Sequence, residues 1–239
     1  MSRIIDFIDR LLSQSRIMEK NGVKVVIKKY DRESGFIKWI TVKTASLMVP
    51  IYPYTFSPRE RMRREVEFFT RRPGNVNVPK ILEVNNDKLY IVREYVDGEV
   101  FSPTFKPDYW SLLAEALYRI HRDNYVMGDS KYTNFMIKDR SQVYVIDAEQ
   151  AIYSEEEIHR AWDILVFLVT TYYPLLMYTI DPWNHKGVRK FIEGYANLGG
   201  VDTLDTLTSE IRLKTIANVL LPFPQGYLVF KTIRDIIRR

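Results

Sequence analysis

The sequence predicts an α+β protein with two lobes, a small β-rich lobe with one helix and a mainly helical lobe. β-Branched and aromatic runs fill the first third of the chain, whereas from about residue 107 apolar residues recur at helical spacing. With 239 residues, of which 46% are hydrophobic and 27% charged, the chain is long and apolar enough for an ordered core. We expect a hinge near residues 97–99, which assigns residues 1–97 to the first lobe and residues 98–239 to the second.

The first lobe begins with two expected strands, residues 23–30 and 36–43, which should pair as a hairpin because a Glu-Ser-Gly turn separates them. A helix should start at Ser57, since a serine cap, a proline and then Glu60 form a capping box. A Pro-Gly pair ends this helix, and two further strands joined by an Asn-Asn-Asp turn follow it.

The expected helix carries one acidic residue on its apolar face. At about 100° per residue, the residues that share this face are Met62, Glu65, Val66 and Phe69. Glu65 therefore points inward, and it needs a cationic partner because burying a carboxylate unpaired is costly.

The composition excludes several kinds of protein. Without cysteine, the chain has no disulfides, no cysteine-ligated zinc and no thiol nucleophile. A net charge of +5 is too small to argue alone for nucleic acid, and the first residues do not form a secretory signal, so we expect a cytoplasmic protein. Residues 164–180 lack charges, but Pro174 interrupts them, which favours a buried helix broken at that proline over a membrane span.

Candidate catalytic residues gather around a second expected hairpin. Folding the chain about the midpoint of Arg140 and Ser141 places Asn134 opposite Asp147. An amide oxygen beside a carboxylate offers the hard ligands that Mg²⁺ prefers. Either residue alone is more often a turn residue that satisfies its own backbone, whereas the pair is less easily explained in this way.

Two further residues precede this pair on the same loop. Asp129, five residues before Asn134, could accept a proton from an attacking hydroxyl, and Lys131 could stabilise charge on a transferred phosphoryl group.

These residues carry a family resemblance. Residues 129–134 have the D-x-K-x-x-N spacing of the protein-kinase catalytic loop, and Asp147 follows at a suitable distance. The chain resembles atypical kinases, namely the kinase subunit of the KEOPS complex, which serves tRNA threonylcarbamoylation, and more distantly the RIO and lipopolysaccharide-core kinases. The resemblance runs from about residue 22 to about residue 195 and implies a two-lobed protein-kinase-like fold, with ATP and Mg²⁺, or Mn²⁺ in its place, as cofactors.

The resemblance also implies a lysine that holds the phosphates and pairs with Glu65. Lys43, at the end of the second expected strand, is the first choice, with Lys28 and Lys38 as alternatives; a surface lysine at a strand end is the competing interpretation of Lys43.

Other implied positions are less marked in the sequence. The backbone carbonyl of Glu94 and the backbone amide of Val96 should bind adenine, and Gly22 is the nearby glycine for a phosphate-covering turn. Asp163 resembles the aspartate that holds the catalytic loop through backbone amides, and it is equally plausible as a charge at a helix N-terminus.

The chain departs from the family pattern at several positions, among them Met127 in place of a histidine and Arg93 in place of an apolar residue at the back of the adenine pocket. It has no G-x-G-x-x-G, and Ala148-Glu149 replaces the Phe-Gly that often follows the metal-binding aspartate. Asp163 follows Asp147 by only 16 positions, too few for a long activation segment.

The leading hypothesis is an ATP-dependent phosphotransferase, an atypical serine/threonine protein kinase that includes itself among its substrates. In it Asp129 is the base, Lys131, Lys43 and Glu65 assist, and Asn134 and Asp147 hold Mg²⁺. Expected partners are ATP, a protein substrate or partner subunit and a tRNA-related complex, without a membrane. The alternatives are a kinase-like scaffold or ATPase within a complex, a small-molecule kinase, and an RNA-associated module suggested by six arginines within residues 59–72.

Overall fold

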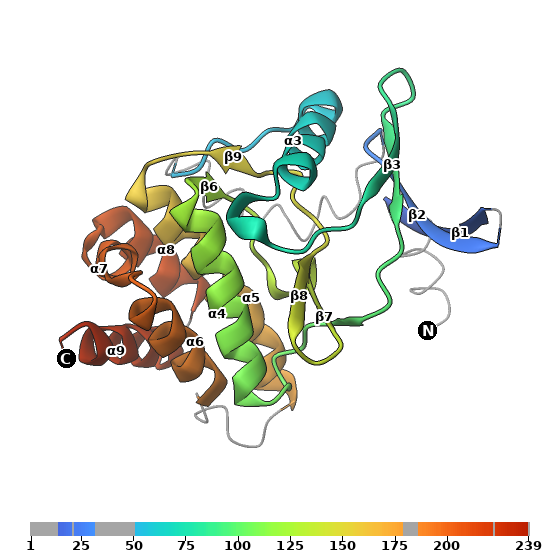
Figure 1. Cartoon of the computed structure of the whole chain (residues 1–239). Coiled ribbons are helices and arrows are strands. Elements are labelled where there is room, and N and C mark those ends of the chain that lie inside the picture. Colours follow the sequence, from blue (N-terminus) through green and yellow to red (C-terminus); the bar gives the residue numbers. More distant parts are fainter. Residues whose placement is uncertain (1–13, 21, 32–50, 179–185, 222, 239) are drawn as a thin grey trace.

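The computed structural model describes residues 14–20, 22–31, 51–178, 186–221 and 223–238. It confirms the predicted α+β class. Among the described residues, an antiparallel sheet and helix α3 form the N-terminal part, and the helices α4 to α9 form the C-terminal part, with the β7–β8 hairpin between them (Figure 1).

The N-terminal sheet has the strand order β1-β2-β4-β3 and is antiparallel throughout. Its strands are β1 (Ser15–Lys20), β2 (Val23–Lys29), β3 (Ile81–Asn85) and β4 (Tyr90–Glu94). Because β1 and β4 occupy both edges of β2, the predicted pairing of this strand with residues 36–43 is wrong; those residues lie outside the described part of the chain. β1 escaped prediction because its sequence, SRIMEK, mixes charges with few β-branched residues.

Helix α3 (Pro58–Arg71) begins where its sequence predicts. The Ser57 hydroxyl accepts a hydrogen bond from the Glu60 amide, Pro58 occupies the first turn, and Arg72 ends the helix in the left-handed region. The predicted inward face is confirmed, since Met62, Glu65 and Phe69 are buried.

Short strands connect the two parts and carry the catalytic-loop region. They are β5 (Glu99–Val100), β6 (Tyr125–Val126), β7 (Phe135–Lys138), β8 (Gln142–Val145) and β9 (Ile152–Tyr153), with two 3₁₀ turns, η1 (Pro73–Asn75) and η2 (Tyr132–Asn134). β7 pairs with β5 and β8, and β6 pairs with β9.

The C-terminal part buries most of the core. Its helices are α4 (Pro107–Arg122), α5 (Glu157–Tyr178), α6 (Lys186–Asn197), α7 (Val201–Ser209), α8 (Ile211–Leu220) and α9 (Gln225–Ile237). The Phe167 ring of α5 stacks on Phe191 of α6 at 4.3 Å between centroids, and both side chains are fully buried. Burial of each such ring stabilises the fold by roughly 1.5–3 kcal/mol.

Helix α5 corrects one prediction. It continues through Pro174 to Tyr178 instead of breaking at the proline. Proline removes one backbone donor, and a helix packed on its neighbours tolerates that loss. None of the helices in the described ranges is both long and apolar enough to cross a membrane.

Candidate active site

A buried ion pair joins the sheet to α3. The Lys28 ammonium on β2 lies 2.5 Å from a Glu65 carboxylate oxygen, and the two residues are 1% and 0% exposed. The predicted inward glutamate thus meets a lysine, and that lysine is Lys28, one of the two alternatives. Lys43 and Lys38 lie outside the described residues, so the structure gives no contact for either.

Sheet order explains why Lys28 was ranked below Lys43. The sequence predicts residues 23–30 as the first strand of a hairpin, and the lysine that pairs with Glu65 is then expected on the second strand, residues 36–43. With β1 in place, β2 is an inner strand, and its pairing with β4 sets Lys28 opposite Ile91, which is fully buried.

Two carboxylates from the segment after β8 complete this cluster. The Lys28 ammonium lies 3.0 Å from Asp147 and 3.4 Å from Glu149. Ligand oxygens of Glu65, Asp147 and Glu149 lie within 4.8 Å of one another, a grouping that could hold a cation. From the sequence, Glu149 was noted only as a departure from the family pattern, and its place in the site was not predicted.

The cluster divides its charge unevenly. Burial alone would lower the pKa of Lys28, but Asp147, Glu65 and Glu149 outweigh it, and the pKa lies well above its usual value. Burial would raise the pKa of Asp147, yet Lys28 and Lys131 hold it at about 2. Burial raises the pKa of Glu65 to about 7, although Lys28 opposes the rise. Of Glu65 and Asp147, Asp147 is therefore the one that is firmly ionised.

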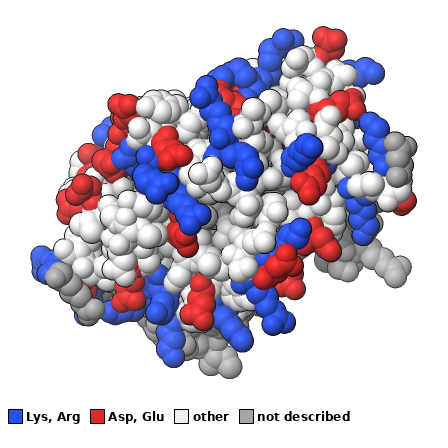
Figure 2. All heavy atoms as spheres, viewed as in Figure 1, with Lys and Arg blue, Asp and Glu red and all other residues white. Residues whose placement is uncertain are grey.

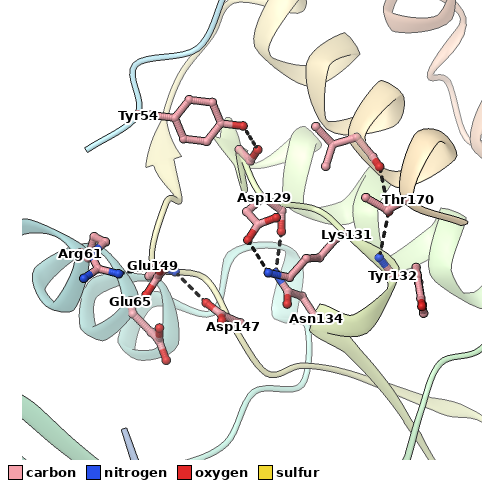
Figure 3. A network of polar contacts seen from close by, with 12 residues as sticks. Tyr54, Arg61, Glu65, Asp129, Lys131, Tyr132, Asn134, Asp147, Glu149 and Thr170 are labelled. Carbon is pink, nitrogen blue, oxygen red and sulfur yellow. Dashed lines mark hydrogen bonds and ion pairs between the residues drawn. The ribbon is translucent and has the colours of Figure 1, made fainter. Parts of the chain in front are cut away.

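The predicted catalytic loop lies beside Asp147 (Figure 3). Asp129 is 5% exposed and forms an ion pair of 2.9 Å with Lys131. The Asn134 amide group donates a hydrogen bond of 2.7 Å to the Asp129 carbonyl, which leaves its own oxygen as the atom available to a cation. Burial raises the pKa of Asp129 to about 6 despite the neighbouring Lys131. Asp129 is thus suited to exchange a proton near neutral pH.

The β7–β8 hairpin has a register one residue different from the prediction. Phe135 pairs with Val145, so Asn134 lies opposite Ile146, whose amide donates to the Asn134 carbonyl at 2.9 Å, and not opposite Asp147. The loop consists of residues 139–141, and Asp139 and Arg140 both adopt positive φ angles, which turn the chain sooner than the predicted midpoint between Arg140 and Ser141. Asp147 follows the last paired position and remains close enough to interact electrostatically with Asp129 and Lys131.

Asp163 of α5 holds the start of the predicted catalytic loop, residues 127–130, as the resemblance predicts. Its carboxylate accepts hydrogen bonds from the amides of Met127 at 2.6 Å and Gly128 at 2.7 Å, and its backbone carbonyl accepts one from the Ser130 hydroxyl. His121 contacts the same carboxylate at 3.0 Å. All of these groups are buried, so the loop has one well-defined position.

The predicted adenine and phosphate positions are only partly brought together. Glu94 ends β4 and Val96 follows it at the connection to the catalytic-loop part, whereas Gly22 forms the β1–β2 turn at φ +76°. Strands rise about 3.3 Å per residue, so Gly22 lies about 20 Å along β2 from Lys28. The structure therefore does not bring Gly22 to the cluster. Arg93 is 6% exposed and donates to the Ile146 carbonyl, a contact that fills space beside Asp147.

The arginines of α3 do not form a free basic surface. Arg63 pairs with Glu60 and Glu67, and Arg71 also pairs with Glu67. Figure 2 likewise shows acidic side chains among the basic ones over this face. Much of the charge that suggested RNA binding is neutralised within the helix itself.

No protein-family model matches the chain. Two curated proteins are similar to it. A "Probable bifunctional tRNA threonylcarbamoyladenosine biosynthesis protein" of Methanoculleus marisnigri is 34% identical over 138 residues, which are 57% of this chain and 24% of that protein. The "KEOPS complex subunit Bud32" of Pyrococcus abyssi is 24% identical over 165 residues, which cover 64% of this chain and 71% of that subunit.

The chain is similar to the KEOPS-type atypical kinases. This similarity confirms the family resemblance predicted from the sequence. The chain spans about a quarter of the length of the first relative and most of the second. Among solved structures, the bifunctional kinase-methyltransferase WbdD aligns over 94% of this chain and 43% of its own, with 13% identity and a TM-score of 0.41.

Proposed function

We propose that the protein is an ATP- and Mg²⁺-dependent phosphotransferase that phosphorylates a serine or threonine hydroxyl of a protein, its own chain included. One observation supports this above all: the buried Lys28–Glu65 pair lies against Asp147, and the Asp129–Lys131 pair lies close to the same carboxylate. The nucleotide would bind between residues 1–97 and residues 98–239, with adenine at Glu94 and Val96.

Within this proposal each charged group has one task. Lys28 holds the phosphates of ATP, and Glu65 orients Lys28 because its carboxylate accepts a hydrogen bond of 2.5 Å from the Lys28 ammonium. Asp129 accepts the proton of the attacking hydroxyl, for which a pKa of about 6 is suited. Lys131 stabilises the charge that develops on the transferred phosphoryl group.

The residues present fit Mg²⁺. Asp147 contributes a carboxylate held ionised, with a pKa of about 2, and Asn134 contributes an amide oxygen whose orientation the Asp129 carbonyl fixes. Mg²⁺ commonly binds through few protein oxygens together with substrate phosphates, where it neutralises phosphate charge, and Mn²⁺ accepts the same ligands.

The test is transfer of radiolabelled phosphate from ATP by the wild type, Asp129→Asn and the matched control Asp139→Asn. Asp139 is an exposed turn residue, so the same chemical change there should leave transfer intact. We expect loss of transfer in the Asp129 variant alone. Equal transfer in all three proteins, or none in the wild type, would contradict the proposal.

A second candidate is an ATPase or nucleotide-binding scaffold within a tRNA-modification complex. The printed names of the two relatives refer to such a pathway and complex, and Glu149 places a third carboxylate 3.4 Å from the lysine proposed to hold phosphate. Calorimetric titration with ATP, with and without Mg²⁺, separates the candidates. Metal-dependent binding with hydrolysis but no transfer to protein supports the ATPase, and transfer to a small alcohol instead supports a small-molecule kinase.

A further inference from the structure

The segment that follows Asp147 is joined to α3 by a largely buried ion pair, whose two side chains are 8% and 13% exposed. One guanidinium nitrogen of Arg61 lies 3.2 Å from a Glu149 carboxylate oxygen, and the other donates to the Tyr30 carbonyl at 2.9 Å. Arg61 is 7% exposed, which is unusual for an arginine on a short helix. The guanidinium thus joins three parts of the chain: α3, the residue after β2 and the segment after β8. Figure 3 shows Arg61 beside Glu149.

The next residue fastens the same segment to the stretch before α3. The Gln150 side chain exchanges two hydrogen bonds of 3.0 Å with the backbone of Thr55, one donated and one accepted. The backbone carbonyl of Gln150 accepts a further bond of 2.7 Å from the Tyr52 hydroxyl. At 2% exposure, Gln150 has the partners that a buried amide requires.

These contacts act on the proposed phosphate-binding pair through helix geometry. Arg61 precedes Glu65 by four residues, so both side chains lie on one face of α3, one turn apart. A shift of the whole of α3 away from the segment after β8 would therefore separate Arg61 from Glu149 and displace Glu65 at the same time. In addition, Arg61 neutralises Glu149, which otherwise would compete with Glu65 and Asp147 for the Lys28 ammonium.

We propose that Arg61 and Glu149 are positioning residues that hold α3 against the segment after Asp147 and so keep Lys28 and Glu65 paired. The inference rests on the proposed function. In this proposal the segment after Asp147 holds α3 in place through Glu149 and Gln150. A contribution to stability alone explains the pair poorly, because a buried ion pair is often no more stabilising than apolar side chains of the same size.

The experiment compares Arg61→Met, Glu149→Gln and the double variant with Arg63→Met, a matched control on the exposed face of the same helix. For each protein, the affinity for Mg-ATP, kcat, KM and the melting temperature are measured. We expect each single variant to weaken Mg-ATP binding and to raise the KM for ATP by about tenfold. The double variant should be no worse than either single variant, because the two residues act as one unit. Arg63→Met should resemble the wild type.

A purely structural role predicts a different result. It would lower the melting temperature and the amount of active protein, and hence the apparent kcat, without a change in KM or in affinity. Unchanged KM and affinity in both single variants, or additive effects in the double variant, would overturn the proposal.

Hydrogen exchange in the nucleotide-free proteins keeps this test separate from the proposed function. We expect faster amide exchange in α3 and in residues 148–151 for Arg61→Met and Glu149→Gln, but not for Arg63→Met. If exchange is unchanged in those two variants, the positioning role fails whatever the chemistry. If the wild type neither binds nor uses ATP while exchange responds as expected, the proposed function fails and the coupling of the segment to α3 stands.

Discussion

The two halves of the candidate site are held in different ways. The predicted catalytic loop is held by hydrogen bonds that the amides of Met127 and Gly128 donate to the Asp163 carboxylate, all within the C-terminal part of the chain. The proposed phosphate-binding half is held by ion pairs among Lys28, Glu65, Asp147 and Glu149, which come from the sheet, from α3 and from the segment after β8. Hydrogen bonds to the backbone fix a loop at any ordinary pH, whereas a group of ion pairs responds to protonation and to a charged ligand. We therefore expect the loop to be the rigid half and the ion cluster the adjustable half.

Removing the anchor of the rigid half should have the largest effect on stability. Asp163→Ala leaves the Met127 and Gly128 amides and the His121 ring without a buried acceptor, and should lower the free energy of unfolding by about 3–5 kcal/mol. Chemical denaturation measures it, with the exposed Asp205→Ala as control. A loss below about 1 kcal/mol would show that the loop does not depend on this carboxylate.

Removing the central cation of the adjustable half should affect activity more than stability. Lys28→Met should lower kcat/KM by about 10²–10³-fold, since the proposed contact with phosphate is lost. Its effect on unfolding should be smaller than that of Asp163→Ala, because Glu65, with a pKa of about 7, can take up a proton instead of remaining charged and unpaired. Lys29→Met, on the exposed face of the same strand, is the control. The comparison breaks down if Lys28→Met unfolds the protein while its remaining folded fraction is fully active.

The pH dependence of activity should reveal the two halves separately. Asp129 must be ionised to accept a proton and Glu65 must be ionised to orient Lys28, so activity should fall as the pH drops through about 7 and then about 6. Two ionisations make the acid limb steeper than a single one. In Glu65→Gln the limb should keep only the step near 6, at lower activity. A flat profile of kcat/KM between pH 5.5 and 8 would exclude both assignments.

The sequence predicted features whose causes are local. The start of α3 follows from Ser57, Pro58 and Glu60, and the inward position of Glu65 follows from helical spacing alone. Asp163 was found through its place in a motif, and its bonds to two amides confirm it. For α3 and Glu65 the residues that decide the structure are close in the chain, whereas Asp163 lies 36 and 35 residues from the amides that donate to it and was predicted from its motif.

Features that depend on pairing between distant segments were predicted less well. Which lysine meets Glu65 depends on the order of strands in the sheet, and β1 was not recognised, so Lys43 was preferred to Lys28. The hairpin register shifted by one because two residues with positive φ shorten its loop, and neither is glycine. Arg61 and Glu149 were missed because charged residues are normally solvated. The one available signal was the position of Arg61, four residues before the inward glutamate.

The smallest expected effect is that of replacing Arg63, the exposed arginine beside the buried Arg61 on α3. Arg63 is two residues from Arg61, its side chain is 59% exposed, and it pairs with Glu60 and Glu67 on the surface. Because solvent screens such pairs, Arg63→Ala should change the free energy of unfolding by less than about 0.5 kcal/mol and leave activity unaltered. Thermal denaturation and phosphate transfer measured together check this. A large loss of activity without a loss of stability would place a functional surface on the exposed face of α3. Activity would then depend on charged residues outside the cluster of Lys28, Glu65, Asp147 and Glu149.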